Sequence, residues 1–425
     1  MVVGRSNTGR ALFEADVWSA MAEALAPADL DGRRVLVIVP DSTRTAPVAL
    51  IRGVLDDLLG RRVSALDYLV ALGTHPVMED AALGALLGVP VHAGRAGRSR
   101  VFNHRWDTPE SFVTLGTIPG KELATVSGGR LELDVPVRLN RLVGKPGESS
   151  PYDQIIVCGP VFPHEVVGFS GGNKYFFPGV AGAEIINVTH WLGALLTSRE
   201  IIGVIDTPVR RLIDQAASLI PTPRMCVALV MHGTSLHGLY VGSMEEAWRA
   251  AAALSEDLNI VRVKSPFQRA LSVIPEMYRD LWTAAKGMYK LEPAIADGGE
   301  VIIFAPHITE VSYVHGRHIE EIGYHVRDYF LAQWDRFKRY PWGVLAHSTH
   351  LRGAGTFEGG VERPRIRVTL ATGIPRERCE RIGLGYLDPR TVDPEAWAGR
   401  EDGGMLLVRR AGEILYRVGP ATDAR

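Results

Sequence analysis

Two apolar runs separated by a helical pattern constrain the fold of this chain more than any other feature. The first run, Arg34–Pro40, has the composition of a fully buried strand, and the second lies near residues 63–72. Pro47 suits the first turn of the helix between them, because a backbone N–H has no partner there to lose. Strand, helix and strand in this order form a parallel pair with a right-handed crossover. We therefore predict an α/β fold, with two α/β domains of mainly parallel sheets and an active-site cleft between them.

The alternation of strands and helices continues along the chain and indicates a boundary near residue 255. We expect an N-terminal cofactor-binding domain at residues 1–255 and a substrate-side domain at 256–410. A C-terminal strand in 411–425 could rejoin the first domain. At 425 residues the chain is long enough for two domains with sizeable cores.

Several local patterns give expectations that a structure can check. Residues 85–150 are rich in glycine and arginine and predict an irregular β insertion. Within it we expect short strands at 131–133 and 135–142. In the second domain we expect a strand at 344–346, helical structure over 318–338, and a final strand at 413–418 paired with the preceding one.

Composition and charge narrow the class of protein. A hydrophobic content of 46% and a charged content of 22% are typical of soluble globular proteins. The net charge of −1 gives no electrostatic reason to expect nucleic acid or an anionic membrane as a partner. The three cysteines are far apart and odd in number, which argues against a disulfide framework. No apolar run reaches the roughly 18–20 residues of a membrane span, and the first residues lack the apolar core of a secretory signal, so we expect a cytoplasmic protein.

Polar side chains follow the predicted strands at their carboxyl ends, the edge where open α/β sheets bind ligands. Asp41-Ser42-Thr43-Arg44 follows the first strand, and Gly73-Thr74-His75 follows the second. A third strand, 155–159, leads into His164, the turn Ser170-Gly171-Gly172-Asn173, Lys174 and a helix that carries His190. Glycines after a strand let backbone N–H groups approach an anion, and a lysine adds a positive charge. This segment therefore predicts binding of a phosphate-bearing ligand, although neither GxxxxGK[ST] nor GxGxxG is present.

Each of these residues also has a purely structural interpretation. Asp41 and Thr43 could cap the helix that begins near Pro47. His75 could be an ordinary loop histidine. Lys286 lies close before a predicted helix end at Gly287, where a lysine suits the helix dipole without any catalytic role. Their shared position at one sheet edge favours the functional interpretation.

Two histidine pairs have the HxxH spacing that a metal site could use. They are His315 with His318, and His347 with His350. Histidines three residues apart share a face of a helix, but His315 is predicted to lie in a loop and His347 to follow a strand. Carboxylate or cysteine companions are not evident in the sequence. We therefore expect these pairs to line a polar pocket or to bond to backbone.

Taken together, these motifs resemble the nickel-dependent lactate racemase family, whose members are 2-hydroxyacid racemases and epimerases that use a nickel-pincer nucleotide. The resemblance rests on DSTR at 41–44, GTH at 73–75, H-x5-SGG-x-K at 164–174, PG at 178–179, His190, and AAKGM at 284–288. It is strongest over 35–80 and 155–192.

The resemblance implies a role for each matching position. It assigns acid/base catalysis to His75 and His164, nickel to His190, and the cofactor, a pyridinium-3,5-bisthiocarboxylate mononucleotide, to Lys174. It places Arg44 and Lys286 at the substrate carboxylate. The remaining positions around the cofactor are Asp41, Thr43, Ser170, Gly171 and Gly172. Thr283 occupies a substrate-side position where lactate racemase itself is expected to have glutamine, so lactate is not implied as the substrate. Cofactor-synthesis proteins are implied as partners in the cell.

The chemistry of a 2-hydroxyacid agrees with this assignment. Its C2–H is too weakly acidic for a simple histidine base near pH 7, so hydride transfer to a cofactor is easier. Inversion then needs one acid/base group for each orientation of the hydroxyl, hence two histidines. We rank a small aliphatic hydroxyacid slightly above a sugar acid such as gluconate. A non-catalytic nickel or nucleotide carrier and an NAD-dependent dehydrogenase are the alternatives, and the missing GxGxxG argues against the latter.

Overall fold

The computed structural model describes residues 2–420, which form two compact units. The first unit contains the chain up to Phe162 together with Phe169–Ile186 and Pro208–Leu258. The second contains Pro163–Gly168, Asn187–Thr207 and the chain from Asn259 onward. Pro163–Gly168 and Asn187–Thr207 thus belong to the second unit although they precede residue 255. The sequence analysis instead expects contiguous domains at 1–255 and 256–410.

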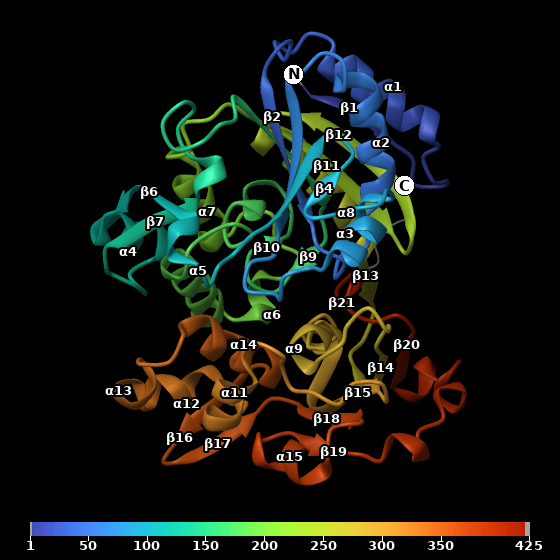
Figure 1. Ribbon diagram of the computed structural model, residues 1–425. Helices are drawn as coiled ribbons and strands as arrows, with labels where there is room; N and C mark the ends of the chain where they lie inside the picture. The colour runs from blue at the N-terminus through green and yellow to red at the C-terminus, as the bar shows by residue number, and fades with distance from the viewer. Residues whose placement is uncertain (1, 421–425) are drawn as a thin grey trace. The chain divides into compact units, whose positions relative to one another are not determined.

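The first unit is built on an eight-stranded sheet whose centre is parallel (Figure 1). Strands β11, β8, β2, β3 and β5 run parallel to their neighbours, and β12, β1 and β4 add antiparallel edges. The predicted strand–helix–strand unit is confirmed as β2, α2 and β3. In sheet order the strands are β1 (Val3–Ser6), β12 (Ser235–Gly242), β11 (Arg224–His232), β8 (Gln154–Pro160), β2 (Arg34–Pro40), β3 (Ala65–Ala71), β5 (Ser99–Asn103) and β4 (Arg95–Ala96).

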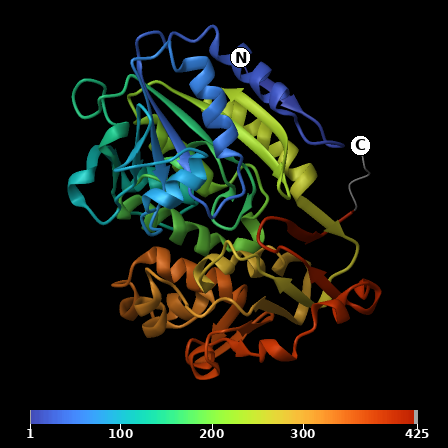
Figure 2. The same ribbon diagram turned by 45° about the vertical axis from the view of Figure 1, so that its right-hand side comes forward.

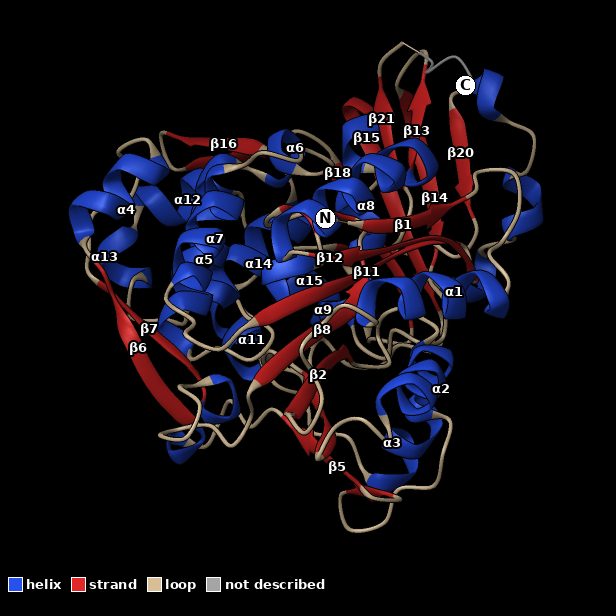
Figure 3. Ribbon diagram, turned by 90° about the horizontal axis from the view of Figure 1, so that it is seen from above, coloured by secondary structure: helices blue, strands red, loops and turns tan. Residues whose placement is uncertain are grey.

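Apolar helix faces cover this sheet and close its core. Helix α2 (Val48–Leu59) buries Ile51, Val54, Leu55 and Leu59 against it, as the helical spacing predicts. Helix α1 (Glu14–Leu25) buries Val17, Ala20, Met21 and Leu25 in the same core. The long neighbouring strands β8, β11 and β12 are seen side by side in Figure 3. Helices α3 (Asp80–Leu87), α4 (Gly120–Ser127), α7 (Pro208–Ser218) and α8 (Met244–Asn259) also lie in this part of the chain, whereas α5 (Ala183–Leu196) begins in the first unit and continues in the second from Asn187.

The predicted insertion at 85–150 is only partly an irregular β region. Strand β5 joins the main sheet next to β3, which the sequence analysis did not anticipate. Strands β6 (Phe112–Ile118) and β7 (Val135–Asn140) pair with each other, and α4 lies between them in sequence. The strand expected at 131–133 does not form, because Leu131 and its neighbours close the turn after α4, where the Leu131 N–H donates to Ser127 Oγ.

The second unit has its own five-stranded sheet, and every pair in it is parallel (Figure 2). A separate pair consists of β13 (Ile260–Val263) and β21 (Leu415–Val418), also parallel. The final strand therefore pairs with β13, and the expected pairing with the strand before it is wrong. It lies in the second unit and does not rejoin the first. The order of the main sheet is β19 (Gly385–Tyr386), β18 (Arg367–Thr372), β15 (Ile295–Ala305), β14 (Phe267–Val273) and β20 (Met405–Val408).

Two further expectations for this unit are corrected. Residues 344–346 lie inside helix α14 (Trp342–Arg352), since a short apolar run does not distinguish a strand from a buried helix. The helical stretch expected over 318–338 is three short helices, α11 (Gly316–Ile322), α12 (Arg327–Ala332) and α13 (Trp334–Phe337). Helix α11 stops at Gly323, whose φ of +75° no helical residue adopts. Among residues 2–420, no helix has the length and apolarity that a membrane crossing requires.

Candidate functional site

Asp41 stands at the carboxyl end of β2 and organises the first cluster of polar groups. Its Oδ1 accepts hydrogen bonds from the Thr43 N–H at 3.0 Å and from the Thr43 hydroxyl at 2.7 Å. The N-cap of α2 is Pro47, and it has no side-chain capping bond. The interpretation of Asp41 and Thr43 as helix caps is therefore wrong.

The second carboxylate oxygen of Asp41 faces His75, which follows β3. Asp41 Oδ2 and His75 Nδ1 are 2.5 Å apart, and Asp41 is 6% exposed. Burial opposes ionisation of this carboxyl, but the charges of His75 and Arg44 and the hydrogen bonds from His75 and Thr43 outweigh it and lower the pKa of Asp41. Because an ionised carboxylate can only accept, His75 Nδ1 must donate. Nε2 is then the nitrogen that carries the lone pair and can take a proton.

Tyr175 brings the glycine-rich segment to the same end of the sheet. A Cβ at Gly159, near the end of β8, would lie 1.9 Å from the Tyr175 hydroxyl, so only glycine lets the ring cross the strand there. Burial raises the pKa of the Tyr175 phenol well above its ordinary value, with Arg44 opposing and Asp41 reinforcing the shift. Within the first unit, Asp41, Arg44 and His75 therefore share one neighbourhood with Tyr175, as the positions after the strands predict.

Two buried side chains donate hydrogen bonds to backbone carbonyls in and next to the Ser170-Gly171-Gly172 turn. Trp248 Nε1 donates to the Ser170 carbonyl at 2.7 Å. Arg210, which is 3% exposed and lies 4.0 Å from the Trp248 ring, donates to the carbonyl of Phe169 at 2.5 Å and to that of Gly171 at 3.3 Å. Both glycines have positive φ. A Cβ added to Gly171 would lie 2.6 Å from Val161, and one added to Gly172 would lie 2.9 Å from Trp248. The glycines thus serve a close packing of the turn.

Two backbone N–H groups at the ends of this turn donate to carbonyls inside the chain. The Ser170 N–H donates to the Phe162 carbonyl at 2.8 Å, and the Lys174 N–H to the Gly171 carbonyl at 3.3 Å. Burial raises the pKa of the Cys226 thiol on the neighbouring strand β11 to about 12. The Ser170 hydroxyl accepts from the Phe162 N–H and donates to the Pro160 carbonyl. These bonds fix the turn and with it Lys174, which lies in the 3-10 turn Gly172–Tyr175.

A second cluster, in the second unit, surrounds His164. Its side chain is 9% exposed, and its Nδ1 accepts from the Val166 N–H at 3.1 Å. A carboxylate oxygen of Glu165 lies 3.2 Å from the same nitrogen. His164 is thus buried, although it follows a strand in a loop-like segment of the sequence.

His190 lies on α5, and His347 and His350 lie near it on α14. The positive charge of a protonated His190 contributes to lowering the pKa of His350 to about 3, although burial is the main cause. Burial likewise lowers the pKa of His347 to about 3, opposed by its hydrogen bond to the Trp282 carbonyl and by Glu165. Both histidines are therefore neutral near pH 7.

The HxxH pairs do not form a protein-only metal site. The His347 ring stacks on Trp282 with centroids 3.8 Å apart, His315 contacts the same indole at 4.5 Å, and His318 contacts Tyr340 instead. Among residues 2–420, no group of three or more His, Cys, Asp or Glu side chains is arranged to hold a metal ion. A single histidine such as His190 therefore fits a metal whose other donors come from a chelating cofactor.

Thr283 and Lys286 lie on short helices α9 (Leu281–Ala284) and α10 (Lys286–Tyr289). The Thr283 hydroxyl donates to Asp280 Oδ1 at 2.7 Å, and the Thr283 N–H donates to the same oxygen at 3.0 Å. Its hydroxyl proton is therefore committed to Asp280. Lys286 Nζ lies 4.3 Å from the centre of the Tyr278 ring.

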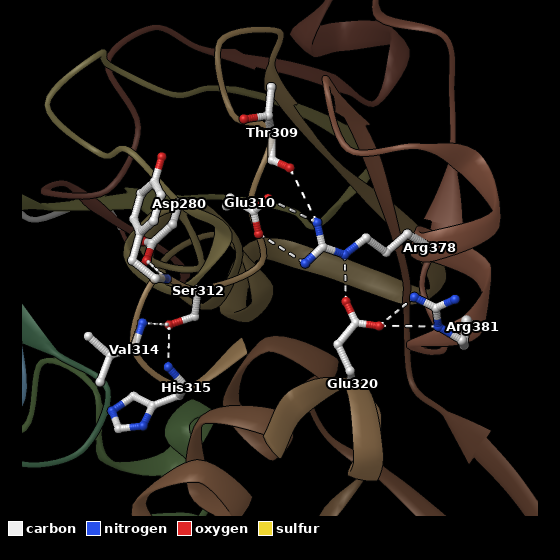
Figure 4. Close-up of polar contacts among 10 residues, drawn as sticks. Asp280, Thr309, Glu310, Ser312, Val314, His315, Glu320, Arg378 and Arg381 are labelled. Atoms are coloured by element: carbon white, nitrogen blue, oxygen red, sulfur yellow. Dashed lines mark hydrogen bonds and ion pairs between the residues drawn. The ribbon is translucent and has the colours of Figure 1, made fainter. Parts of the chain in front are cut away.

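The segment that carries His315 is fixed by Asp280 and by an ionic network (Figure 4). Asp280 Oδ2 accepts from the Tyr313 N–H, and Ser312 Oγ from the N–H groups of Val314 and His315. At the other end of the segment, Arg378 lies 2.9 Å from Glu310 and 2.5 Å from Glu320, which also binds Arg381. His315 is thereby held against Trp282.

Four residues of these clusters escaped the sequence analysis: Glu165, Tyr175, Trp282 and Asp280. Glu165 and Tyr175 adjoin His164 and Lys174, so their proximity to predicted site residues was a usable signal. Trp282 and Asp280 precede Thr283 in the same way.

Comparison with known proteins gives a consistent set of relatives. Residues 18–203 match the lactate racemase N-terminal domain family. Lactate racemase from Thermoanaerobacterium thermosaccharolyticum is 24% identical over 281 residues, which is 64% of this chain but only 60% of that enzyme. A Thermotoga maritima protein of known crystal structure is 30% identical, with a TM-score of 0.88 over 98% of this chain and 100% of the other. The lactate racemase apoprotein from T. thermosaccharolyticum, at 18% identity, has a TM-score of 0.71 over 98% of this chain and 94% of its own, and so shares the fold.

Proposed function

This chain belongs to the lactate racemase family, and from that premise we propose that it is a racemase or epimerase that inverts C2 of a 2-hydroxycarboxylic acid. The observation that carries the proposal is the pairing of Asp41 with His75, 2.5 Å apart. A histidine oriented by a buried ionised carboxylate is a general base ready for use, and it gives His75 a catalytic rather than a structural role.

The proposed cofactor is a nickel-pincer nucleotide, which supplies a hydride acceptor when bound. His190 would bind the nickel and Lys174 the nucleotide. The donor set fits this group, because residues 2–420 contain no group of three or more His, Cys, Asp or Glu side chains that could hold a bare ion, and a metal at His190 would take its other donors from a chelating cofactor. Cofactor-synthesis proteins are the partners that this proposal requires.

In the proposed reaction the protein holds the substrate and moves the hydroxyl proton. Arg44 offers a planar pair of donors for the substrate carboxylate, and Lys286 adds a point charge. His75 Nε2 takes the hydroxyl proton of one enantiomer as hydride leaves C2. His164 serves the hydroxyl of the opposite enantiomer. In each direction one histidine removes the hydroxyl proton and the other supplies its own proton to the same oxygen, so both return to their starting forms by proton exchange between turnovers.

One observation favours a polyhydroxylated substrate as a second candidate. His347 is 9% exposed, and its Nδ1 has no hydrogen-bond partner among residues 2–420. It stacks on Trp282, the residue before Thr283. A methyl-sized substituent offers nothing to such a group, whereas the hydroxyls of a sugar acid do. We therefore keep a gluconate-type 2-epimerase beside a small aliphatic hydroxyacid racemase.

The test is isotope exchange with protein produced together with the cofactor pathway. Substrates labelled with deuterium at C2 should invert and keep most of the label, because the hydride returns to the same carbon. His75→Ala and His164→Ala should each reduce turnover by at least about 10²-fold, while His190→Ala should lose nickel. A protein that binds nickel and cofactor stably but exchanges no label with any hydroxyacid would be a carrier and not a racemase.

A further inference from the structure

Glu165 is a charged, largely buried residue to which neither the sequence motifs nor the reaction so far assign a role. Its side chain is 17% exposed, and one carboxylate oxygen lies 3.2 Å from His164 Nδ1. It is also among the charges that act on the neutral His347 of α14. Glu165 is therefore in contact with the His164 imidazole and close enough to His347 for its charge to act there.

The Nδ1 atom of His164 has two neighbours with opposite requirements. The Val166 N–H, at 3.1 Å, can only donate, so it favours an Nδ1 without a proton. A neutral imidazole then carries its proton on Nε2 and cannot accept a proton there. The Glu165 carboxylate, in contrast, can only accept and favours a protonated Nδ1. The backbone alone would therefore keep His164 in the form that cannot act as a base at Nε2.

We propose that Glu165 is a positioning residue that makes His164 competent as a base, by stabilising the form with its proton on Nδ1. In this form Nε2 carries the lone pair, as it does in His75 beside Asp41. When His164 takes a proton on Nε2, it becomes an imidazolium ion whose Nδ1–H still faces the carboxylate. When it returns that proton, the starting form is restored. This inference rests on the proposed function for its catalytic meaning.

The other ionisable groups around this pair do not compete for the charge of Glu165. His347 is neutral near pH 7, because burial lowers its pKa to about 3. His315 and His350 act on His347 from the start of α11 and from α14, and His350 is neutral for the same reason as His347. The carboxylate of Glu165 is therefore available to His164.

The experiment compares ring nitrogen signals of the full-length chain labelled with ¹⁵N-histidine, near pH 7. His164→Asn identifies the His164 signals. We expect the wild type to show the Nδ1–H form and Glu165→Gln to shift the tautomer ratio toward Nε2–H by about tenfold, since an adjacent opposite charge is worth about one pKa unit or more. Glutamine keeps the size of the side chain but not its charge. Glu165→Asp keeps the charge and should restore part of the wild-type ratio.

Glu362→Gln is the matched control, because Glu362 is also 17% exposed and lies 2.9 Å from Nδ1 of His325 in the same unit. It should change the signals of His325 and leave those of His164 unchanged. Identical His164 signals in the wild type and Glu165→Gln would overturn the proposal, as would an equal response to Glu362→Gln. These signals need neither cofactor nor substrate. If they respond as expected while no hydroxyacid is isomerised, the role of Glu165 holds and the proposed function fails.

Discussion

The Nδ1 atom of His75 lies 2.5 Å from Oδ2 of Asp41, so a histidine after β3 and an aspartate after β2 form one hydrogen-bonded pair. The remaining oxygen of Asp41 is occupied by Thr43. Both oxygens of this buried carboxylate are thus satisfied without a ligand, which keeps it ionised and fixes the His75 ring. Through this pair Asp41 orients the imidazole of His75.

Asp41→Asn should reduce turnover strongly while leaving the fold intact. The asparagine amide can donate to His75 Nδ1, which places the imidazole proton on Nε2 and removes the base. We expect kcat to fall by about 10²- to 10⁴-fold, measured with the best substrate of a hydroxyacid panel. Thr43→Val, which removes one hydrogen bond but keeps the Asp41 charge, should cost less than about tenfold. Equal losses in the two variants would contradict the pairing as the source of the effect.

The sequence predicted where these groups lie but not how they pair. Asp41 and His75 fall after parallel strands, and the carboxyl ends of such strands meet at one edge, so their proximity followed from the order of elements. The hydrogen bond between them joins residues 34 positions apart and depends on side-chain rotation, which no local pattern encodes.

Misjudged elements have a common physical cause. Val344–Ala346 is apolar and short, and only burial on all sides, provided by the rest of the fold, makes it part of α14. Strand β21 finds its partner β13 about 150 residues away in sequence, a choice set by tertiary packing. The glycines at 171 and 172 also pack closely against Val161 and Trp248, a long-range contact that no local pattern encodes.

Gly171→Ala should destabilise the first unit by more than the backbone strain of an alanine at positive φ. Gly171 has a φ of +82°, and an added Cβ would lie 2.6 Å from Val161 Cγ2. We expect the free energy of unfolding, from urea titration, to fall by about 2–4 kcal/mol, the sum of backbone strain and overpacking. Gly233→Ala is the control, because its φ is +58° with nothing within 4 Å of the added atom, and it should cost only about 1 kcal/mol. Equal costs would show that the contact with Val161 relaxes freely.

His347 should make the protein less stable in acid. Burial lowers its pKa to about 3 in the folded chain, so below its ordinary value of 6.5 the unfolded chain binds a proton that the folded chain does not. Stability from this group is therefore lost as the pH falls from about 6.5 toward 3, by about 1.4 kcal/mol for each pH unit. His347→Phe keeps a ring against Trp282 but cannot take up a proton. Its free energy of unfolding, from urea titrations at pH 7.0, 5.5 and 4.5, should therefore rise relative to that of the wild type by about 1.4 kcal/mol for each pH unit below about 6.5. The same substitution at the exposed His92 should leave the pH dependence as in the wild type.

The aromatic ring beneath Lys286 should help to hold this lysine for the substrate. Lys286 Nζ lies 4.3 Å from the centre of the Tyr278 ring, a distance at which the ring face attracts a cation with about 0.5–2 kcal/mol. Lys286→Met should lower kcat/KM by about 10- to 150-fold, because a charge-assisted hydrogen bond to the substrate carboxylate is lost. Tyr278→Leu should raise KM by about 2- to 30-fold through the misplaced ammonium group, whereas Tyr278→Phe keeps the ring and should stay within about twofold of the wild type. An unchanged KM in Tyr278→Leu, together with a normal far-ultraviolet circular dichroism spectrum, would mean that the ring does not position Lys286 for binding.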